Sequence, residues 1–295
     1  MRCPHTIATA ALLLSSAPAF ADYTVVAPVR PLTMSDPSGL TVIGLDFQLT
    51  RWTEHPPAPA AAVDVTSVTA EVAADIRLAP HWVLLARVPA SHATIDGDPA
   101  RDGCCSLGLG NLTLGARGLW SSRRGTGVRA VSGFELSVSV PTASDSGDRG
   151  SSAAVGAFAE LPHDLGRYAP DTTTARLTGI TQLYSRWFLL HGELGLQLHL
   201  YNGDAPGDRS DLGLRFALGA GIRATHTIAI LAELSAQWFF SNRFAGDNDT
   251  VTALDVGLRY GSGGAIVGLR VYVPLDSGLR DLDMLGLGLD LGLRF

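Results

Sequence analysis

Residues 285–295, which end the chain, read LGLGLDLGLRF, and their alternation decides the fold. Every second residue is a leucine until the terminal Phe295, and the residues between them are glycine, aspartate or arginine. Neighbouring side chains of a β-strand point to opposite faces of the sheet. The segment therefore predicts a strand with one apolar face and one face of small or charged residues. A strand of a transmembrane barrel, with lipid on one side and a lumen on the other, has this pattern.

The same period of two recurs along the chain before this segment. It predicts about twelve strands, with about ten or about fourteen as the alternatives. The predicted strands cover residues 43–49, 68–78, 82–88, 112–120, 134–140, 177–183, 188–200, 212–222, 228–238, 254–260, 267–273 and 285–295.

The connections between the predicted strands alternate in length. Short links lie near Pro80 and at 121–127, 185–186, 225–226 and 261–264, and longer polar ones at 54–63, 93–106, 141–172, 202–210, 241–250 and 275–281. Alternating short turns and long loops are typical of outer-membrane barrels. A soluble β-sandwich also alternates apolar and polar residues, but its connections need not alternate in length. We therefore predict an all-β fold, a transmembrane antiparallel up-and-down β-barrel. The pattern leaves open whether 141–172 contains a helix.

The N-terminus predicts export from the cytoplasm. Residues 1–21 have a basic start, an apolar run and a small-x-small cleavage motif, as a secretory signal peptide does. We expect residues 22–38 to form a periplasmic N-terminal segment, a candidate plug, and residues 39–295 to form the barrel in the cell outer membrane. Short turns and both termini would then face the periplasm.

Composition excludes several function classes. The formal net charge of −6 argues against a nucleic-acid partner, which would require a basic face. The adjacent Cys104 and Cys105 cannot join distant segments, and no further ligands at zinc-site spacing accompany them. We therefore expect neither a metal nor another cofactor.

The polar faces of the predicted strands carry charges of both signs, which we expect to line the lumen. Because an unpaired buried charge is costly, facing charges should pair and partly close the lumen. The alternative is a narrow pathway whose selectivity these charges set. The predicted lumen-lining residues are Asp46, Glu71, Asp75, Arg77, Arg87, Arg117, Arg129, Glu135, Arg176, Glu193, Arg215, Arg223, Glu233, Asp255, Arg259, Arg270, Asp290 and Arg294.

Two further patterns concern the ends of the strands. Six arginines lie close to a short link or terminus and predict a basic ring at the periplasmic mouth, namely Arg77, Arg117, Arg129, Arg223, Arg259 and Arg294. Five tryptophans lie at or near strand ends and predict an aromatic girdle at the membrane interface, namely Trp52, Trp82, Trp120, Trp187 and Trp238.

No catalytic constellation stands out in the sequence. His191, Glu193 and His199 share the polar face of one predicted strand. At strand rise the two histidines lie roughly 27 Å apart, too far to share one metal. We therefore expect histidines in the lumen rather than an enzyme.

Three stretches resemble a known family: PLTMSDPSGLTVIGLDFQLT at 31–50, GLGNLTLGARGLW at 108–120 and FELSVSVPTASDSGD at 134–148. They resemble the outer-membrane β-barrels described as transporters or as MetA-pathway phenol-degradation-like proteins. That group usually has an acidic residue where Asn111 stands. The resemblance implies a barrel fold but no particular substrate.

The last residues also resemble the C-terminal signal that the barrel-assembly machinery recognises in its clients. The carrying residues are Leu291, Leu293 and Phe295. The resemblance implies that the apolar face meets outer-membrane lipid and that Phe295 marks the strand for insertion.

Two functions remain in view. The first is passive transport of a small-molecule solute, amphipathic or anionic, through the barrel. The second is a closed barrel with a structural or surface-interaction role and no transport.

Overall fold

The computed structural model describes residues 38–55, 62–97, 107–124, 128–143, 147–202, 210–240, 250–262 and 264–295. Twelve antiparallel strands close into a barrel, and a short additional strand, β4, pairs with β3. The strands are β1 (Val42–Glu54), β2 (Val63–Ala79), β3 (Trp82–Asp96), β4 (Gly108–Leu109), β5 (Leu112–Arg124), β6 (Val128–Val140), β7 (Thr172–Tyr184), β8 (Phe188–Tyr201), β9 (Ser210–Arg223), β10 (Ile228–Phe239), β11 (Thr250–Ser262), β12 (Ala265–Pro274) and β13 (Leu285–Arg294).

The barrel closes because the first strand pairs with the last. β1 and β13 are antiparallel, in a register that runs from Val42 opposite Arg294 to Arg51 opposite Leu285. The remaining barrel strands pair with their neighbours in the chain order, which is the up-and-down topology that the sequence predicts. The predicted fold class is thus confirmed.

The alternation predicted from residues 285–295 is also present in the structure. The leucines of β13 are exposed on the outside of the barrel, whereas Gly286, Gly288 and Asp290 are buried on the inside. The other strands repeat this burial pattern, so an apolar surface surrounds a polar interior. Leu291, Leu293 and Phe295 belong to the exposed face, and the Phe295 backbone N–H donates to the Thr41 carbonyl oxygen at 2.8 Å.

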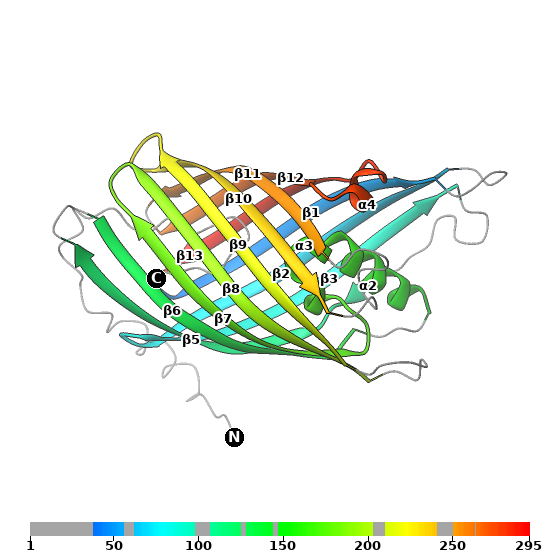
Figure 1. Ribbon diagram of the computed structural model, residues 1–295, viewed down its shortest axis with the longest axis horizontal. Helices are drawn as coiled ribbons and strands as arrows, with labels where there is room; N and C mark the ends of the chain where they lie inside the picture. The colour runs from blue at the N-terminus through cyan, green and yellow to red at the C-terminus, as the bar shows by residue number, and fades with distance from the viewer. Residues whose placement is uncertain are drawn as a thin grey trace, which may run out of the picture.

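The two ends of the barrel differ. The short turns and the C-terminus lie at one end, and the longer connections at the other (Figure 1). We call these the turn end and the loop end. A short helix, α4 (Ser277–Arg280), lies at the loop end, where the Asp276 carboxylate accepts from the Leu279 N–H at 2.9 Å.

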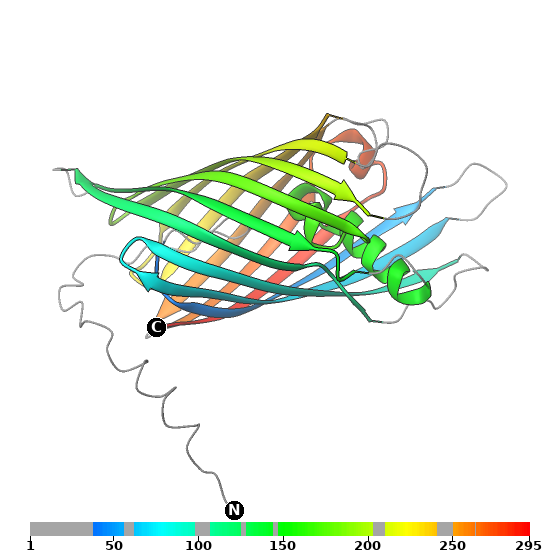
Figure 2. The same cartoon turned by 90° about the horizontal axis from the view of Figure 1, so that it is seen from below.

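The long β6–β7 connection folds inward at the loop end. It forms α2 (Gly147–Ala159), α3 (Leu161–Asp164) and the 3₁₀ helix η1 (Leu165–Arg167), which lie against β2, β3, β10 and β11 (Figures 1 and 2). We call residues 147–168 the inserted segment. The sequence left open whether residues 141–172 contain a helix, and the structure shows that they do. The candidate plug at residues 22–38 lies outside the described residues, apart from Ser38.

An apolar cluster joins the inserted segment to the barrel wall. Leu161, Leu165 and Tyr168 pack with buried wall residues that include Phe239 and Val251. Trp52 belongs to this cluster, and its ring centroid lies 5.3 Å from that of Phe158.

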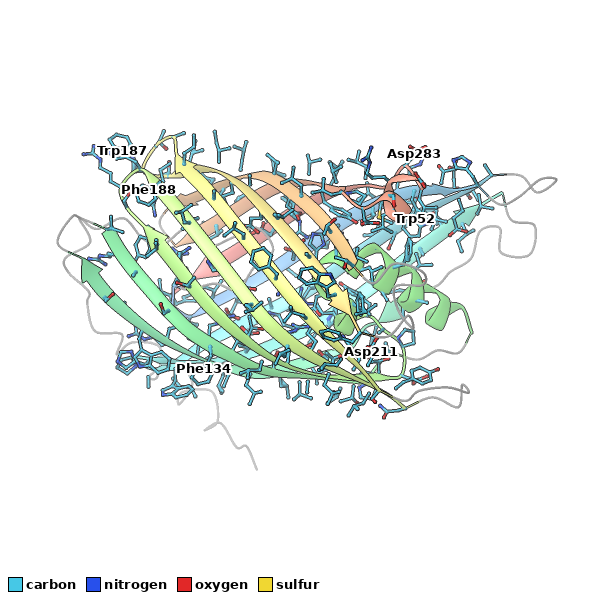
Figure 3. All side chains as sticks on the ribbon, viewed as in Figure 1. Trp52, Phe134, Trp187, Phe188, Asp211 and Asp283 are labelled. Atoms are coloured by element: carbon cyan, nitrogen blue, oxygen red, sulfur yellow. The ribbon has the colours of Figure 1, made fainter. Side chains whose placement is uncertain are left out.

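This position contradicts the prediction for Trp52, which is buried inside the barrel rather than at the membrane interface (Figure 3). Trp52 lies on the inward face of β1 with Gln48 and Thr50, so the period of two places its ring inside, where the inserted segment contacts it. The other predicted girdle residues, Trp82, Trp120, Trp187 and Trp238, are exposed. Trp82 and Trp120 contact Phe134, with ring centroids 5.9 and 5.8 Å from it.

Candidate functional site

Charged side chains on the inner wall form the most extensive polar feature of the barrel. Every one of the twelve barrel strands contributes at least one of them. We call this set the charge belt, and it consists of Asp46, Glu71, Asp75, Arg87, Arg117, Glu135, Arg176, Glu193, Arg215, Glu233, Asp255, Arg259, Arg270 and Asp290.

Ion pairs link four neighbouring strands on one side of the belt. Arg87 pairs with Asp75 and lies 3.5 Å from a Glu71 oxygen. Arg117 bridges the next gap, with one nitrogen 3.2 Å from Asp75 and another 2.7 Å from Glu135. The Arg117 side chain is almost fully buried, so the two carboxylates offset the desolvation of its charge.

The opposite side of the belt also pairs its charges. Arg215 donates to Glu193 at 3.1 Å, and His191 lies 3.4 Å from the other Glu193 oxygen. Arg259 pairs with Asp290, and Arg270 donates to Gln48 at 2.7 Å and to Asp46 at 3.3 Å. Opposite charges thus meet around the lumen, as expected if it is salt-bridged.

Inward glycines let two of these arginines reach past a neighbouring strand. Arg259 on β11 meets Asp290 on β13 across Gly268 of β12, where a Cβ would lie 2.3 Å from the guanidinium. Arg270 on β12 crosses Gly288 of β13 to reach β1, and a Cβ on Gly288 would lie 2.3 Å from its Nε. Gly268 of β12 and Gly288 of β13 therefore leave room for arginine side chains that lie flat on the wall.

The six arginines of the predicted basic ring differ in burial. Arg77, Arg129 and Arg294 are partly exposed on inward positions, and Arg223 is nearly buried beside them in the same end of the barrel. Arg117 and Arg259 are fully buried in ion pairs with belt carboxylates. The basic ring of six arginines stays a prediction, and within it the charges of Arg117 and Arg259 are paired with acids.

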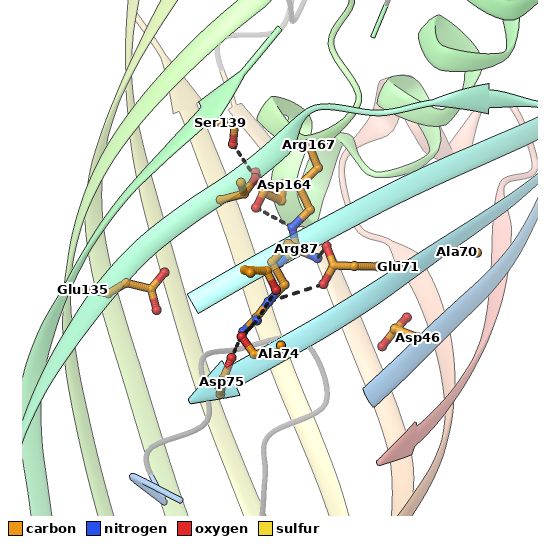
Figure 4. Close-up of polar contacts among 12 residues, drawn as sticks. Asp46, Ala70, Glu71, Ala74, Asp75, Arg87, Glu135, Ser139, Asp164 and Arg167 are labelled. Carbon is orange, nitrogen blue, oxygen red and sulfur yellow. Dashed lines mark hydrogen bonds and ion pairs between the residues drawn. The ribbon is translucent and has the colours of Figure 1, made fainter. Parts of the chain in front are cut away.

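The inserted segment places its own charges against the belt. Asp164 pairs with Arg176 of β7 and accepts from Arg167 Nε at 2.7 Å. Arg167 extends to Glu71 of β2 at 3.0 Å (Figure 4). Burial alone would raise the pKa of Asp164, but Arg176 and Arg167 outweigh it and hold that pKa well below its usual range. Asp164 is therefore ionised and connects β7 to β2 across the lumen.

A histidine makes a second ionic contact with the wall. His163 Nε2 lies 2.8 Å from Asp255 of β11, and its Nδ1 lies 3.5 Å from Glu160. Glu160 also accepts from the Thr69 hydroxyl at 2.8 Å. Burial would lower the pKa of His163, but Asp255 and Glu160 outweigh it and raise the pKa to about 9. The imidazolium therefore holds the segment to β11 at neutral pH.

Asn111, between β4 and β5, holds the end of the inserted segment. Its amide nitrogen donates to the carbonyl oxygens of Gly166 at 3.0 Å, Ala169 at 2.8 Å and Thr172 at 3.2 Å. Its side-chain oxygen accepts from the Ala143 N–H at 3.0 Å, and its own backbone N–H donates to the Arg167 oxygen at 2.6 Å. One fully buried amide thus fixes both ends of the connection.

The sequence reasoning missed the inserted segment, although a signal was present. Glu160, His163, Asp164 and Arg167 follow the i, i+3, i+4, i+7 spacing of one helical face. In a connection outside the strands, such a charged face indicates a helix that needs a charged partner.

The three polar residues of β8 lie apart from any metal-like arrangement. His199 Nδ1 is hydrogen-bonded to the Thr174 hydroxyl at 2.9 Å, and His191 Nε2 lies 3.4 Å from a Glu193 carboxylate oxygen. Within the described residues, no cluster of histidine, cysteine, aspartate or glutamate is arranged to hold a metal ion.

Comparisons with known proteins address the fold. No protein-family model and no curated protein matches the sequence. The structure is similar to that of an outer membrane channel from Pseudomonas putida F1, with a TM-score of 0.59 and 13% sequence identity, over 91% of this chain and 100% of that chain. None of the helices in the described part of the chain is long and apolar enough to cross a membrane.

Two further structures match with lower TM-scores. One is the transport unit of the autotransporter AIDA-I from Escherichia coli, with a TM-score of 0.46, 6% identity, and coverage of 92% of this chain and 95% of that chain. The other is the KdgM porin in complex with disordered oligogalacturonate, with a TM-score of 0.43, 9% identity, and coverage of 86% and 99%. At these identities the likeness concerns the fold alone, and the chain has the fold of an outer-membrane β-barrel.

Proposed function

We propose that this chain is an outer-membrane channel for small solutes whose lumen the inserted segment closes. The exposed apolar face fits a lipid environment, and the signal-peptide pattern of residues 1–21 fits export. In this proposal the turn end faces the periplasm, the loop end faces outside, and the barrel-assembly machinery recognises Leu291, Leu293 and Phe295.

The observation that carries the proposal is how the inserted segment is held. Its contacts with the belt are ionic, through Asp164 with Arg176, Arg167 with Glu71 and His163 with Asp255. The belt has separate pairs of its own, such as Arg117 with Glu135, which do not involve the segment. Withdrawal of the segment would therefore leave the twelve strands of the barrel in place and much of the belt's charge paired.

The solute class follows from the sign of the charges near the turn end. Arg77, Arg129, Arg223 and Arg294 lie on inward positions there. Charged groups that line a pore select ions by sign. We therefore propose small amphipathic or anionic solutes.

A second candidate function is a closed barrel with a structural or surface-interaction role. The apolar cluster around Trp52, Phe239 and Tyr168 favours it, because such packing fills the loop end as a protein core does. Under this alternative the inserted segment never leaves the lumen.

The geometry of the connection provides a clean test. The Asp171 N–H donates to the Ala143 oxygen at 3.0 Å, so the two ends of the connection already touch. Residues 144–170 can therefore be replaced by Gly-Gly, a two-residue hairpin turn. We expect the refolded variant to give steady single-channel currents in planar bilayers, whereas the wild type opens rarely.

Reversal potentials in a salt gradient test the solute class on the same variant. We expect anion selectivity that weakens with Arg223→Ala and Arg294→Ala. A deletion variant that shifts on heating as folded barrels do, yet carries no current, would refute the channel and favour the closed barrel.

A further inference from the structure

The wall between β3 and β5 differs from the rest of the barrel. β3 pairs with β5 only from Trp82 opposite Gly118 to Arg87 opposite Thr113. On its other edge β3 pairs with β2 along nearly its whole length, from Trp82 to Asp96. Beyond Arg87, the described residues give β3 only the two-residue strand β4 on this edge, through Ala90 with Leu109 and Ser91 with Gly108.

The local sequence explains why the pairing stops. Pro89 has no N–H to donate, and its carbonyl oxygen accepts instead from the Gly110 N–H at 2.8 Å. A Cβ on Gly110 would lie 2.8 Å from the Pro89 ring and 2.5 Å from the Arg167 carbonyl oxygen. The chain therefore passes between β3 and the inserted segment at this point, and only glycine fits there.

The inserted segment replaces the missing strand contacts. The Asn111 N–H, next in line along this edge, donates to the Arg167 oxygen of η1 rather than to β3. On the inner side α2 lies against β3 and β4 (Figure 2). The Ser91 hydroxyl donates to the Ser152 carbonyl oxygen of α2 at 2.8 Å. A Cβ on Gly156 of α2 would lie 2.7 Å from Ser91 Cβ.

The outer side of the junction is apolar. Val88, Leu107, Leu109 and Leu114 are all exposed on the outside of the barrel there, and Leu107 and Leu109 are exposed by 65% and 60%. An opening at this junction would lead from the lumen into hydrocarbon rather than into water, so it would suit solutes without charge.

We propose that the β3–β5 junction is a lateral portal, closed by α2 and β4, through which small uncharged apolar solutes pass from the lumen into the bilayer. The coupling to the inserted segment is direct, because withdrawal of that segment removes α2 from the inner face and the Arg167 oxygen from Asn111. Release of β4 then requires the two residue pairs with β3 and the Gly110–Pro89 hydrogen bond to break. The portal rests on the proposed channel function and adds a second exit to it.

A disulfide across β4 and β3 tests the portal. Ala90 and Leu109 are register partners, so Ala90→Cys with Leu109→Cys can lock the junction in a chain that also carries Cys104→Ser and Cys105→Ser. The matched control pair is Ala220→Cys with Ala232→Cys, register partners on β9 and β10 with exposed side chains, in a fully paired part of the wall. Both proteins are produced in cells, oxidised, and checked for complete cross-linking and heat-modifiable folding.

The readout is entry of N-phenyl-1-naphthylamine, an uncharged dye that fluoresces in the membrane of intact cells. We expect oxidation of the Ala90–Leu109 pair to slow dye entry several-fold, dithiothreitol to restore it, and the control pair to have no effect. Dye entry at an unchanged rate in the fully locked protein would overturn the portal. Salt conductance in planar bilayers should persist in the locked protein. If the lock abolishes both the conductance and the dye entry, the two solutes share one route and a separate lateral route is overturned. A wild-type chain that neither conducts nor admits dye would refute the channel itself.

Discussion

Asn111→Asp is the sharpest single test of how the inserted segment is held. The change keeps the shape of the side chain and replaces its amide nitrogen by oxygen. That nitrogen faces three carbonyl oxygens, of Gly166, Ala169 and Thr172, at 2.8 to 3.2 Å. A carboxylate at this site would direct an oxygen at three acceptors and leave them without a donor.

The expected loss can be worked out from these contacts. The two amide hydrogens account for about 1 kcal/mol each as ordinary hydrogen bonds. Burying a carboxylate against carbonyl oxygens adds a penalty, so that the total reaches about 3–5 kcal/mol. The ratio of docked to withdrawn segment should therefore fall by roughly two to three and a half orders of magnitude.

The assay is the open probability of single channels, compared with urea unfolding of the barrel. We expect Asn111→Asp to open far more often while the barrel unfolds at a similar urea concentration. Asn202→Asp is the matched control, because Asn202 is exposed and its side-chain amide donates to the Thr173 hydroxyl rather than to buried carbonyl oxygens. An Asn111→Asp channel as closed as the wild type would show that this amide does not hold the segment.

Three other predictions follow from the same contacts. Protonated His163 stabilises the docked segment fully at pH values below 6.5, the ordinary histidine pKa, and this stabilisation is lost as the pH rises through about 9. Channels should therefore open more often at high pH, and His163→Gln should remove this pH dependence. An equal pH dependence of opening in both proteins would contradict the role of His163. Gly288→Ala should destabilise the barrel by about 1–3 kcal/mol in urea because its Cβ displaces Arg270, whereas Gly292→Ala, with ordinary contacts only, should not; equal effects would refute the crossing arrangement. Deleting Phe295 should reduce the amount of heat-modifiable barrel in outer membranes far more than the loss of an exposed ring suggests, and normal accumulation would argue against an assembly signal.

Period-two patterning was sufficient to predict the barrel and which residues face inward. Each strand carries that information locally, because a shift by one residue would expose the whole polar face to lipid. The partners of the inward charges could not be predicted in the same way. Arg270 finds Gln48 and Asp46 across an intervening strand, and such a contact depends on Gly288 and on barrel closure rather than on spacing.

The inserted segment was beyond the reach of the strand pattern for a different reason. It is a long connection, and the positions of its apolar and charged residues are determined by contacts with the barrel wall rather than by a local repeat. Trp52 shows the difference, because the period of two places it on the inward face of β1, but only the folded connection supplies its neighbour Phe158. The strand pattern predicts on which face a side chain lies, and the tertiary structure determines which residues it contacts there.

The contact of Arg270 with β1 also bears on the order in which the barrel forms. Arg270 belongs to the last strand but one, and its partners Asp46 and Gln48 belong to the first. The contact cannot form until β1 has paired with β13. This pairing has the greatest sequence separation in the barrel, and because closing a long loop costs the most chain entropy, we expect it to form late. A mutation of Arg270 should therefore accelerate unfolding much more than it slows folding, because this arginine stabilises only the closed barrel.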